Sequence, residues 1–326
     1  MSWGTGFELP PEKARIARRA RRLEWATIGF FVTAVTAVYL AMGSSQAMKA
    51  AWIEDLLAFI PPIAFLVANR IRYRQPNERY PYGYHRAVAI GFLISAFALL
   101  TLGGYIVYDS IMKLISFEHP PIGVVQPFGE PIWLGWLMIA ALLYTLGPAV
   151  ILGRLKLPLA ASLHDKILYA DAEMNRADWM TAGAAILGIL GIRFGLWWTD
   201  AVAALAISVG IVNDGIKSLG AAVGELMAKR PRTVDDSGDD PLQARIETEL
   251  RRLSWVKDVR VRLREEGHVF YGEAAIVPST IDDPIGRIEE AAETAQSLDW
   301  RMHDLVVSLA PEVPEFESGR PEGASR

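Results

Sequence analysis

Long apolar segments constrain the fold of this chain more than any other feature of its sequence. A helix needs roughly 20 predominantly apolar residues to cross the hydrocarbon core of a bilayer. Six segments meet this requirement, at residues 25–43, 48–69, 87–115, 132–153, 166–192 and 197–228. The pattern predicts an all-α polytopic membrane bundle of six transmembrane helices over residues 25–229, preceded by a basic N-terminus at residues 1–24.

Basic residues are distributed unevenly among the loops between these segments. Arg and Lys cluster at residues 13–22, 70–86, 154–166 and 229–232, whereas the alternate loops carry few of them. Because cytoplasmic loops are enriched in Arg and Lys, this distribution places both termini in the cytoplasm. We therefore expect a multi-pass protein of the cell (inner) membrane, with the lipid bilayer as its surroundings.

The sequence after the last apolar segment is typical of a soluble domain. Residues 230–240 are polar and acidic, as in a linker, and residues 313–326 have the composition of a disordered tail. Between them, apolar residues repeat at helical spacing in residues 241–253 and 284–298, and strand patterns occur at 259–263, 269–277 and 305–309. The order α-β-β-α-β predicts a small cytoplasmic α+β domain over residues 241–312.

Composition excludes several classes of function. The chain has no cysteine, which removes disulfides, thiolate zinc sites and cysteine nucleophiles, and its net charge is −4, so we expect no nucleic-acid partner. An intramembrane protease is the enzyme class to consider, but the H-E-x-x-H and G-x-G-D motifs do not occur. We expect no enzyme, no catalytic residues and no permanent cofactor.

Acidic side chains interrupt the second and fifth apolar segments. Glu54 and Asp55 lie in the second, and the fifth contains four residues that share one helical face: Asp171, Met174, Asn175 and Asp178. Glu173 and Arg176 lie off that face, where they can meet each other or a neighbouring helix. An ionisable group inside a bilayer costs a few kcal/mol or more, so each is a functional candidate. The alternative is that these acids only neutralise basic residues in a structural network.

Carboxylate and amide oxygens bind hard or borderline divalent ions, whereas a thioether is a weaker and softer ligand. The predicted metal site therefore draws on six residues: Asp55, Asp178, Met174, Asp171, Asn175 and Glu54. Protons and metal ions compete for the same carboxylate oxygens. This competition is the minimal chemistry of a cation/proton antiporter whose substrate is a divalent cation of the Zn²⁺, Mn²⁺ or Fe²⁺ class.

Three stretches resemble the cation diffusion facilitator family of divalent-metal/proton antiporters. They are residues 75–87 (QPNERYPYGYHRA), 103–114 (GGYIVYDSIMKL) and 171–178 (DAEMNRAD), the last of which is similar to the family pattern D-A-x-H-N-x-x-D. The resemblance implies export of a divalent cation from the cytoplasm by alternating access. It also implies a homodimer with a ferredoxin-like or metallochaperone-like cytoplasmic domain.

The chain departs from the family at its metal ligands. Members bind the ion through two residues four apart on each of the second and fifth spans, and these positions correspond here to Asp55 and Phe59, and to Met174 and Asp178. An oxygen-rich site suits manganese, iron(II) or magnesium-like ions better than zinc, which favours nitrogen and sulfur ligands. The loss of two ligands leaves a second hypothesis open: a non-transporting dimeric membrane protein with a regulatory or scaffolding role.

Overall fold

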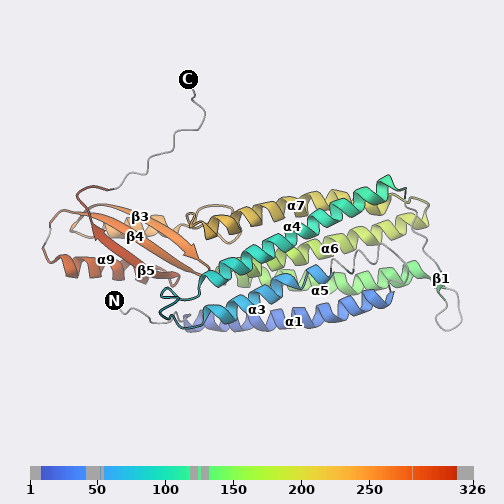
Figure 1. Ribbon diagram of the computed structural model, residues 1–326, viewed down its shortest axis with the longest axis horizontal. Coiled ribbons are helices and arrows are strands. Elements are labelled where there is room, and N and C mark those ends of the chain that lie inside the picture. Colours follow the sequence, from blue (N-terminus) through green and yellow to red (C-terminus); the bar gives the residue numbers. More distant parts are fainter. Residues whose placement is uncertain are drawn as a thin grey trace, which may run out of the picture. The chain divides into compact units, whose positions relative to one another are not determined.

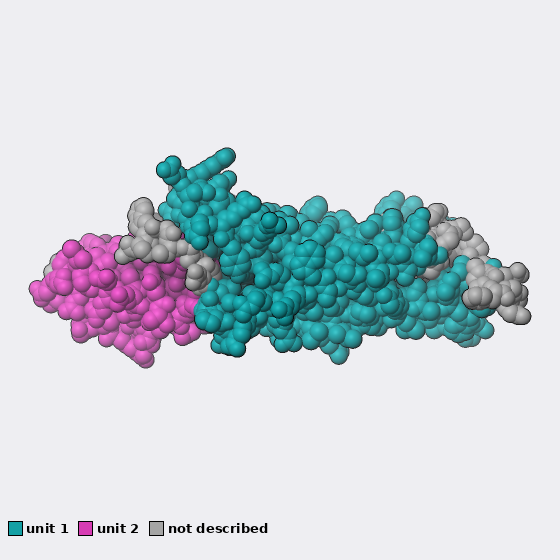
Figure 2. Space-filling model, turned by 90° about the horizontal axis from the view of Figure 1, so that it is seen from below, with its two compact units in different colours: residues 1–227, 233–237, 266–268 teal, residues 228–232, 238–265, 269–326 magenta. Residues whose placement is uncertain are grey.

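The computed structural model describes residues 9–41, 52, 55–117, 124–125, 132–280 and 282–313. Contacts between residues divide the chain into two compact units, coloured separately in Figure 2. The first unit comprises residues 1–227 with 233–237 and 266–268. The second comprises residues 228–232, 238–265 and 269–326. The predicted linker at residues 230–240 is thus shared between the two units, and the predicted disordered tail lies almost wholly outside the described residues.

The first unit is a bundle of long helices that lie side by side (Figure 1). In chain order they are α1 (Pro11–Ala41), α3 (Ile60–Arg72), α4 (Arg86–Ile115), α5 (Leu134–Leu163), α6 (Lys166–Arg193) and α7 (Thr199–Leu226). Two short antiparallel strands, β1 (Val124–Val125) and β2 (Ile132–Trp133), precede α5. Helix α1 packs on α5, α5 on α6, and α4 on α7.

Among the described residues, four helices are long and apolar enough to cross a membrane: α1, α4, α5 and α7. This apolar bundle fits a multi-pass membrane protein. Helix α6 carries Asp171, Glu173, Arg176 and Asp178. Part of the predicted second span, including Glu54, lies outside the described residues. The count of six spans therefore stays a prediction.

Helix α1 begins at Pro11, well before the predicted first span. Its buried positions follow helical spacing through the basic region and beyond it: Ala17, Ala20, Glu24, Thr27, Phe31, Ala34 and Val38. The arginines of the region occupy the exposed face. In the basic region the buried stripe consists of alanine, glutamate and threonine, so mean hydropathy does not reveal it. Helix α5 likewise continues beyond residue 153, and Lys156 is fully buried.

A sharp turn places α5 and α6 next to each other. His164 ends α5 in the left-handed conformation with φ of 50°, and the Asp165 side chain then accepts a hydrogen bond from the Leu168 amide at 3.0 Å. The helices approach closely at Gly153, where an added Cβ would lie 3.3 Å from the Asn175 Cβ. Side chains of α5 therefore meet the polar face of α6.

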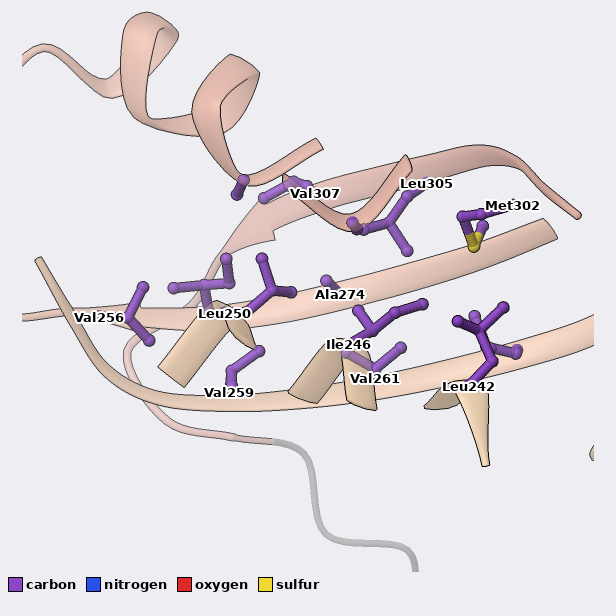
Figure 3. Packing of buried hydrophobic residues seen from close by; sticks show 14 of the residues in the cluster. Leu242, Ile246, Leu250, Val256, Val259, Val261, Ala274, Met302, Leu305 and Val307 are labelled. Carbon is purple, nitrogen blue, oxygen red and sulfur yellow. The ribbon is translucent and has the colours of Figure 1, made fainter. Parts of the chain in front are cut away.

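The second unit is a three-stranded sheet with two helices. Its elements are α8 (Leu242–Arg251), β3 (Val256–Glu266), β4 (Val269–Pro278), α9 (Pro284–Leu298) and β5 (Met302–Leu309). The sheet order is β3-β4-β5, and β4 runs parallel to β5. The core joins residues from α8 and all three strands (Figure 3): Leu242, Ile246, Leu250, Val259, Val261, Ala274 and Leu305. A small α+β domain follows the helical bundle, in the predicted order of elements.

Arg301 holds together the start of α8 and the start of β5. Its Nη1 donates to Asp240 Oδ2 at 2.6 Å, and its Nη2 donates to Asp299 Oδ2 at 2.9 Å. Burial by itself would raise the pKa of Asp299, but the hydrogen bonds from Arg301 outweigh it and hold that pKa below its ordinary value. The ionised carboxylate is thus preferred in the folded state.

We expect this arrangement to make the second unit acid-sensitive. A carboxyl group with a lowered folded pKa stabilises the fold above its unfolded pKa of about 4, and this contribution is lost as the pH falls through the folded pKa. Hydrogen exchange of the β5 amides in the full-length protein measures this contribution to the stability of the second unit. Protection should fall from pH 6 to pH 3 more steeply in the wild type than in Arg301→Met. Arg252→Met, which removes an exposed pair with Glu249, should keep the wild-type dependence.

Candidate metal site

Asp55 and Asp178 line a single cavity of about 50 Å³ in the first unit. Asp55 belongs to the helical turn that precedes α3, and Asp178 belongs to α6. Two threonines, Thr145 of α5 and Thr181 of α6, provide the other polar side chains of the lining. The remaining lining residues are apolar: Phe30, Phe31, Ala34, Val38, Leu142, Ala149, Ala182 and Ala185. Two carboxylates from separate segments therefore share one largely apolar space.

A short turn precedes α3 and separates it from the helical segment that contains Asp55. Residues 58–59 form a turn, and Pro61 and Pro62 occupy the first positions of α3. Proline has no amide hydrogen to donate back to the preceding turn, so it ends one helical segment and is well suited to begin the next. Asp55 therefore lies in a short helical segment, separated from α3 by the turn at residues 58–59.

Phe59 and Met174, the two apolar residues at the ligand positions that the resemblance predicts, lie in or against an apolar cluster. Met174 is fully buried in a cluster that includes Leu99, Leu102 and Ile211, and Phe59 packs against the same cluster. The rings of Phe59 and Phe31 are 5.5 Å apart between centroids, and Phe31 also lines the cavity. Met174 is not among the residues that line the cavity. Met174 and Phe59 therefore belong to or pack against one hydrophobic cluster.

Asp171 occupies a different environment from Asp178, although both lie on α6. Its carboxylate forms a fully buried ion pair with Lys156 of α5, and Lys156 Nζ lies 3.3 Å from Glu24 Oε2 of α1. We call Glu24, Lys156 and Asp171 the charge triad. Asn175 donates from Nδ2 to the Asp171 carbonyl oxygen at 2.8 Å. Neither Asp171 nor Asn175 lines the cavity. The alternative interpretation, in which an acid neutralises a basic residue in a structural network, thus fits Asp171, and Lys156 is its basic partner.

Glu24 and Lys156 were not predicted as site residues, because Glu24 follows the basic cluster at residues 13–22 and Lys156 lies within the cluster at residues 154–166. The signal that could have found Glu24 is its place in the buried stripe of α1, three or four residues from Ala20 and Thr27. Thr145 and Thr181 were missed because single hydroxyl groups are common in apolar helices. Glu54 lies outside the described residues.

Glu173 and Arg176 pair with each other as the sequence suggested, with Nη1 and Oε2 3.1 Å apart. Together with Asp214 of α7 they line a second cavity of about 30 Å³. Within the described residues, no group of three or more His, Asp or Glu side chains is placed to hold a metal ion. Among the described residues, the carboxylates of the first cavity are the pair Asp55 and Asp178, and the other polar side chains of its lining are hydroxyls.

The chain is similar to a known transmembrane domain and to several proteins of known name. Residues 25–227 match the model of the cation efflux transmembrane domain. Manganese efflux system protein MneS of Bacillus subtilis is 25% identical over 178 residues, which cover 54% of this chain and 57% of MneS. Magnetosome protein MamB of Paramagnetospirillum magneticum is 22% identical over 262 residues, 79% of each chain. Manganese efflux system protein MneP of Bacillus subtilis is 23% identical over 269 residues, 80% of this chain and 83% of MneP.

Proposed function

Because this chain belongs to the cation diffusion facilitator family, whose cation efflux domain matches residues 25–227, we propose that it exports a divalent metal cation from the cytoplasm. One observation carries the proposal: Asp55 and Asp178, from two separate segments of the bundle, line the same cavity. A pair of carboxylates in an apolar space binds a divalent cation because the cation neutralises charge that is costly to bury.

Exchange for protons follows from the same pair of carboxylates. A carboxylate binds the cation only when it is deprotonated, so each cation that leaves can be replaced by protons on the same oxygens. Alternating access to the cavity from the two sides of the membrane converts this competition into antiport. Asp55 and Asp178 are the proposed ligands. Asp171 and Asn175 are proposed to support the site without binding the cation. The Asp171 carboxylate is already paired with the Lys156 ammonium, and Asn175 donates to the Asp171 carbonyl oxygen.

The polar lining of the cavity favours an oxygen-preferring cation. Its polar groups are carboxylates and hydroxyls, whereas zinc favours nitrogen and sulfur. Two of the relatives described above are named as manganese efflux proteins. We therefore place Mn²⁺ first among the substrates, with Fe²⁺ next, and zinc as the substrate that this site disfavours.

The remaining parts of the proposal concern topology and assembly. Six spans with both termini in the cytoplasm follow from the distribution of Arg and Lys in the sequence. The small α+β domain is proposed as the contact between the subunits of a homodimer. We propose the cell (inner) membrane as the location.

Flux measurements test the proposal directly. The purified protein is reconstituted into liposomes with a pH gradient, and Mn²⁺, Fe²⁺ and Zn²⁺ are offered in turn. We expect accumulation of Mn²⁺ that depends on the gradient, together with proton movement in the opposite direction. A folded, monodisperse protein that moves none of the three cations would contradict the transporter and favour the non-transporting alternative.

A further inference from the structure

The cavity contains two hydroxyl groups that neither the family's motif nor the sequence reasoning assigns. We infer that Thr145 and Thr181 supply additional oxygen ligands to the cation held by Asp55 and Asp178, and so select an oxygen-preferring cation over zinc. The inference rests on the proposed function, because it requires that this cavity holds the transported cation.

Thr181 lies on the same face of α6 as Asp178. It lies three residues after Asp178, so both side chains occupy the same face of the helix, and both line the cavity. Thr145 reaches the same cavity from α5, which packs along α6. The oxygen-bearing groups thus come from three places in the bundle: the turn before α3, α5 and α6.

The hydrogen bonds of the two hydroxyls determine what they offer to the cavity. Thr145 Oγ1 donates to the Leu142 carbonyl oxygen at 2.9 Å. Thr181 Oγ1 lies 3.1 Å from the Ala177 carbonyl oxygen and 3.0 Å from that of Asp178. A hydroxyl has one proton and two lone pairs. Each hydroxyl proton is already donated to a carbonyl oxygen of the helix backbone. The lone pairs of the two hydroxyl oxygens therefore stay available, and a cation binds to such lone pairs.

The resulting set of ligands contains oxygen alone. Two carboxylates and two hydroxyls are the polar groups, and the other eight lining residues are apolar. Mn²⁺ and similar cations accept carboxylate, hydroxyl and water oxygens, and a space of about 50 Å³ has room for a cation with a small number of water molecules. Zinc prefers nitrogen and sulfur in a tetrahedral set of four ligands, so neutral hydroxyls should contribute less to its binding than to that of Mn²⁺.

Substitution by valine removes each hydroxyl while it keeps the shape of the side chain. Thr145→Val and Thr181→Val should each weaken Mn²⁺ binding to the detergent-solubilised protein by about ten-fold, at the low end of the loss seen when groups that support metal ligands are removed. Zn²⁺ binding should change by less than about two-fold. Thr101→Val is the matched control, because Thr101 makes the same bond to its helix backbone, with Oγ1 2.8 Å from the Phe97 carbonyl oxygen, and lies outside the cavity.

A cysteine at the same place gives a second test that does not depend on the valine variants. The chain has no cysteine of its own, so Thr181→Cys introduces a single thiol. A thiolate is a soft ligand, and the variant should bind Zn²⁺ at least about ten-fold more tightly than the wild type does. Bound Zn²⁺ should also slow alkylation of the thiol.

The outcomes separate this inference from the proposed function. If both valine variants bind Mn²⁺ as the wild type does, and zinc neither binds more tightly to Thr181→Cys nor protects its thiol, the hydroxyls are not ligands. Asp178→Asn then decides the proposed function by itself. If Asp178→Asn also retains normal binding and transport, the cavity is not the cation site and both proposals fail.

Discussion

Replacing Asp178 with asparagine is expected to abolish transport of divalent cations. The substitution keeps the size of the side chain but removes a negative charge from a largely apolar cavity, and the loss of one partner of a buried charge pair costs about 3–5 kcal/mol. This corresponds to a reduction of cation binding by at least about 100-fold. Asp55→Asn should have the same effect. The rate of Mn²⁺ flux into liposomes at a fixed pH gradient measures both variants.

The comparison between single and double variants sharpens this test. If both carboxylates hold one cation, either substitution alone removes most of the binding, and the double variant should be little worse than either single variant. Asp214→Asn serves as the control, because Asp214 lines the second cavity with Glu173 and Arg176 and lies apart from Asp55 and Asp178. Normal flux in Asp178→Asn, in a protein that is folded, would refute the assignment of this cavity.

The second large effect is expected at Lys156. Lys156→Met removes the one cation of the charge triad and leaves the carboxylates of Glu24 and Asp171 close to each other in a fully buried place. Removal of one member from a buried ion pair typically costs about 3–5 kcal/mol. We expect the melting temperature of the solubilised protein to fall well below that of the wild type, as measured by loss of monodisperse protein on heating.

A neutral version of the whole triad provides the control. In Glu24→Gln with Lys156→Met and Asp171→Asn, no charge is left without a partner, and such replacements are often close to neutral in stability. The triple variant should therefore recover most of the loss. If Lys156→Met alone melts like the wild type, the three charges are not coupled in the folded protein. If the triple variant is less stable than Lys156→Met, the carboxylates of Glu24 and Asp171 stabilise the bundle even without Lys156, which contradicts this explanation.

The second unit was largely predictable because its periodicities are clear. The range predicted for α9, residues 284–298, agrees with the structure, since Pro284 starts the helix and Asp283 caps it. The strands extend further than their apolar alternation suggested. In β3 the alternation predicted residues 259–263, whereas the strand runs from Val256 to Glu266. The ends of β3 carry charged residues that a pattern of hydrophobic residues does not detect.

The candidate site was predictable only in part. Spacing along one helix places Asp171, Asn175 and Asp178 on a common face, but spacing does not indicate which helix covers each part of that face. Asp171 meets Lys156 and lies in the charge triad, whereas Asp178 meets the cavity that Asp55 also lines. The difference depends on how α1 and α5 pack along α6. That packing depends in turn on small residues, such as Gly153, which give little signal in the sequence.

The charge triad also has a consequence for biogenesis. Chains are synthesised from the N-terminus, so α1 leaves the ribosome before Lys156 of α5 exists. Until then Glu24 lacks the ammonium group of Lys156, and an uncompensated charge costs less at the aqueous surface of the membrane than inside it. The contact between Glu24 of α1 and Lys156 of α5 therefore forms only after α5 has been synthesised.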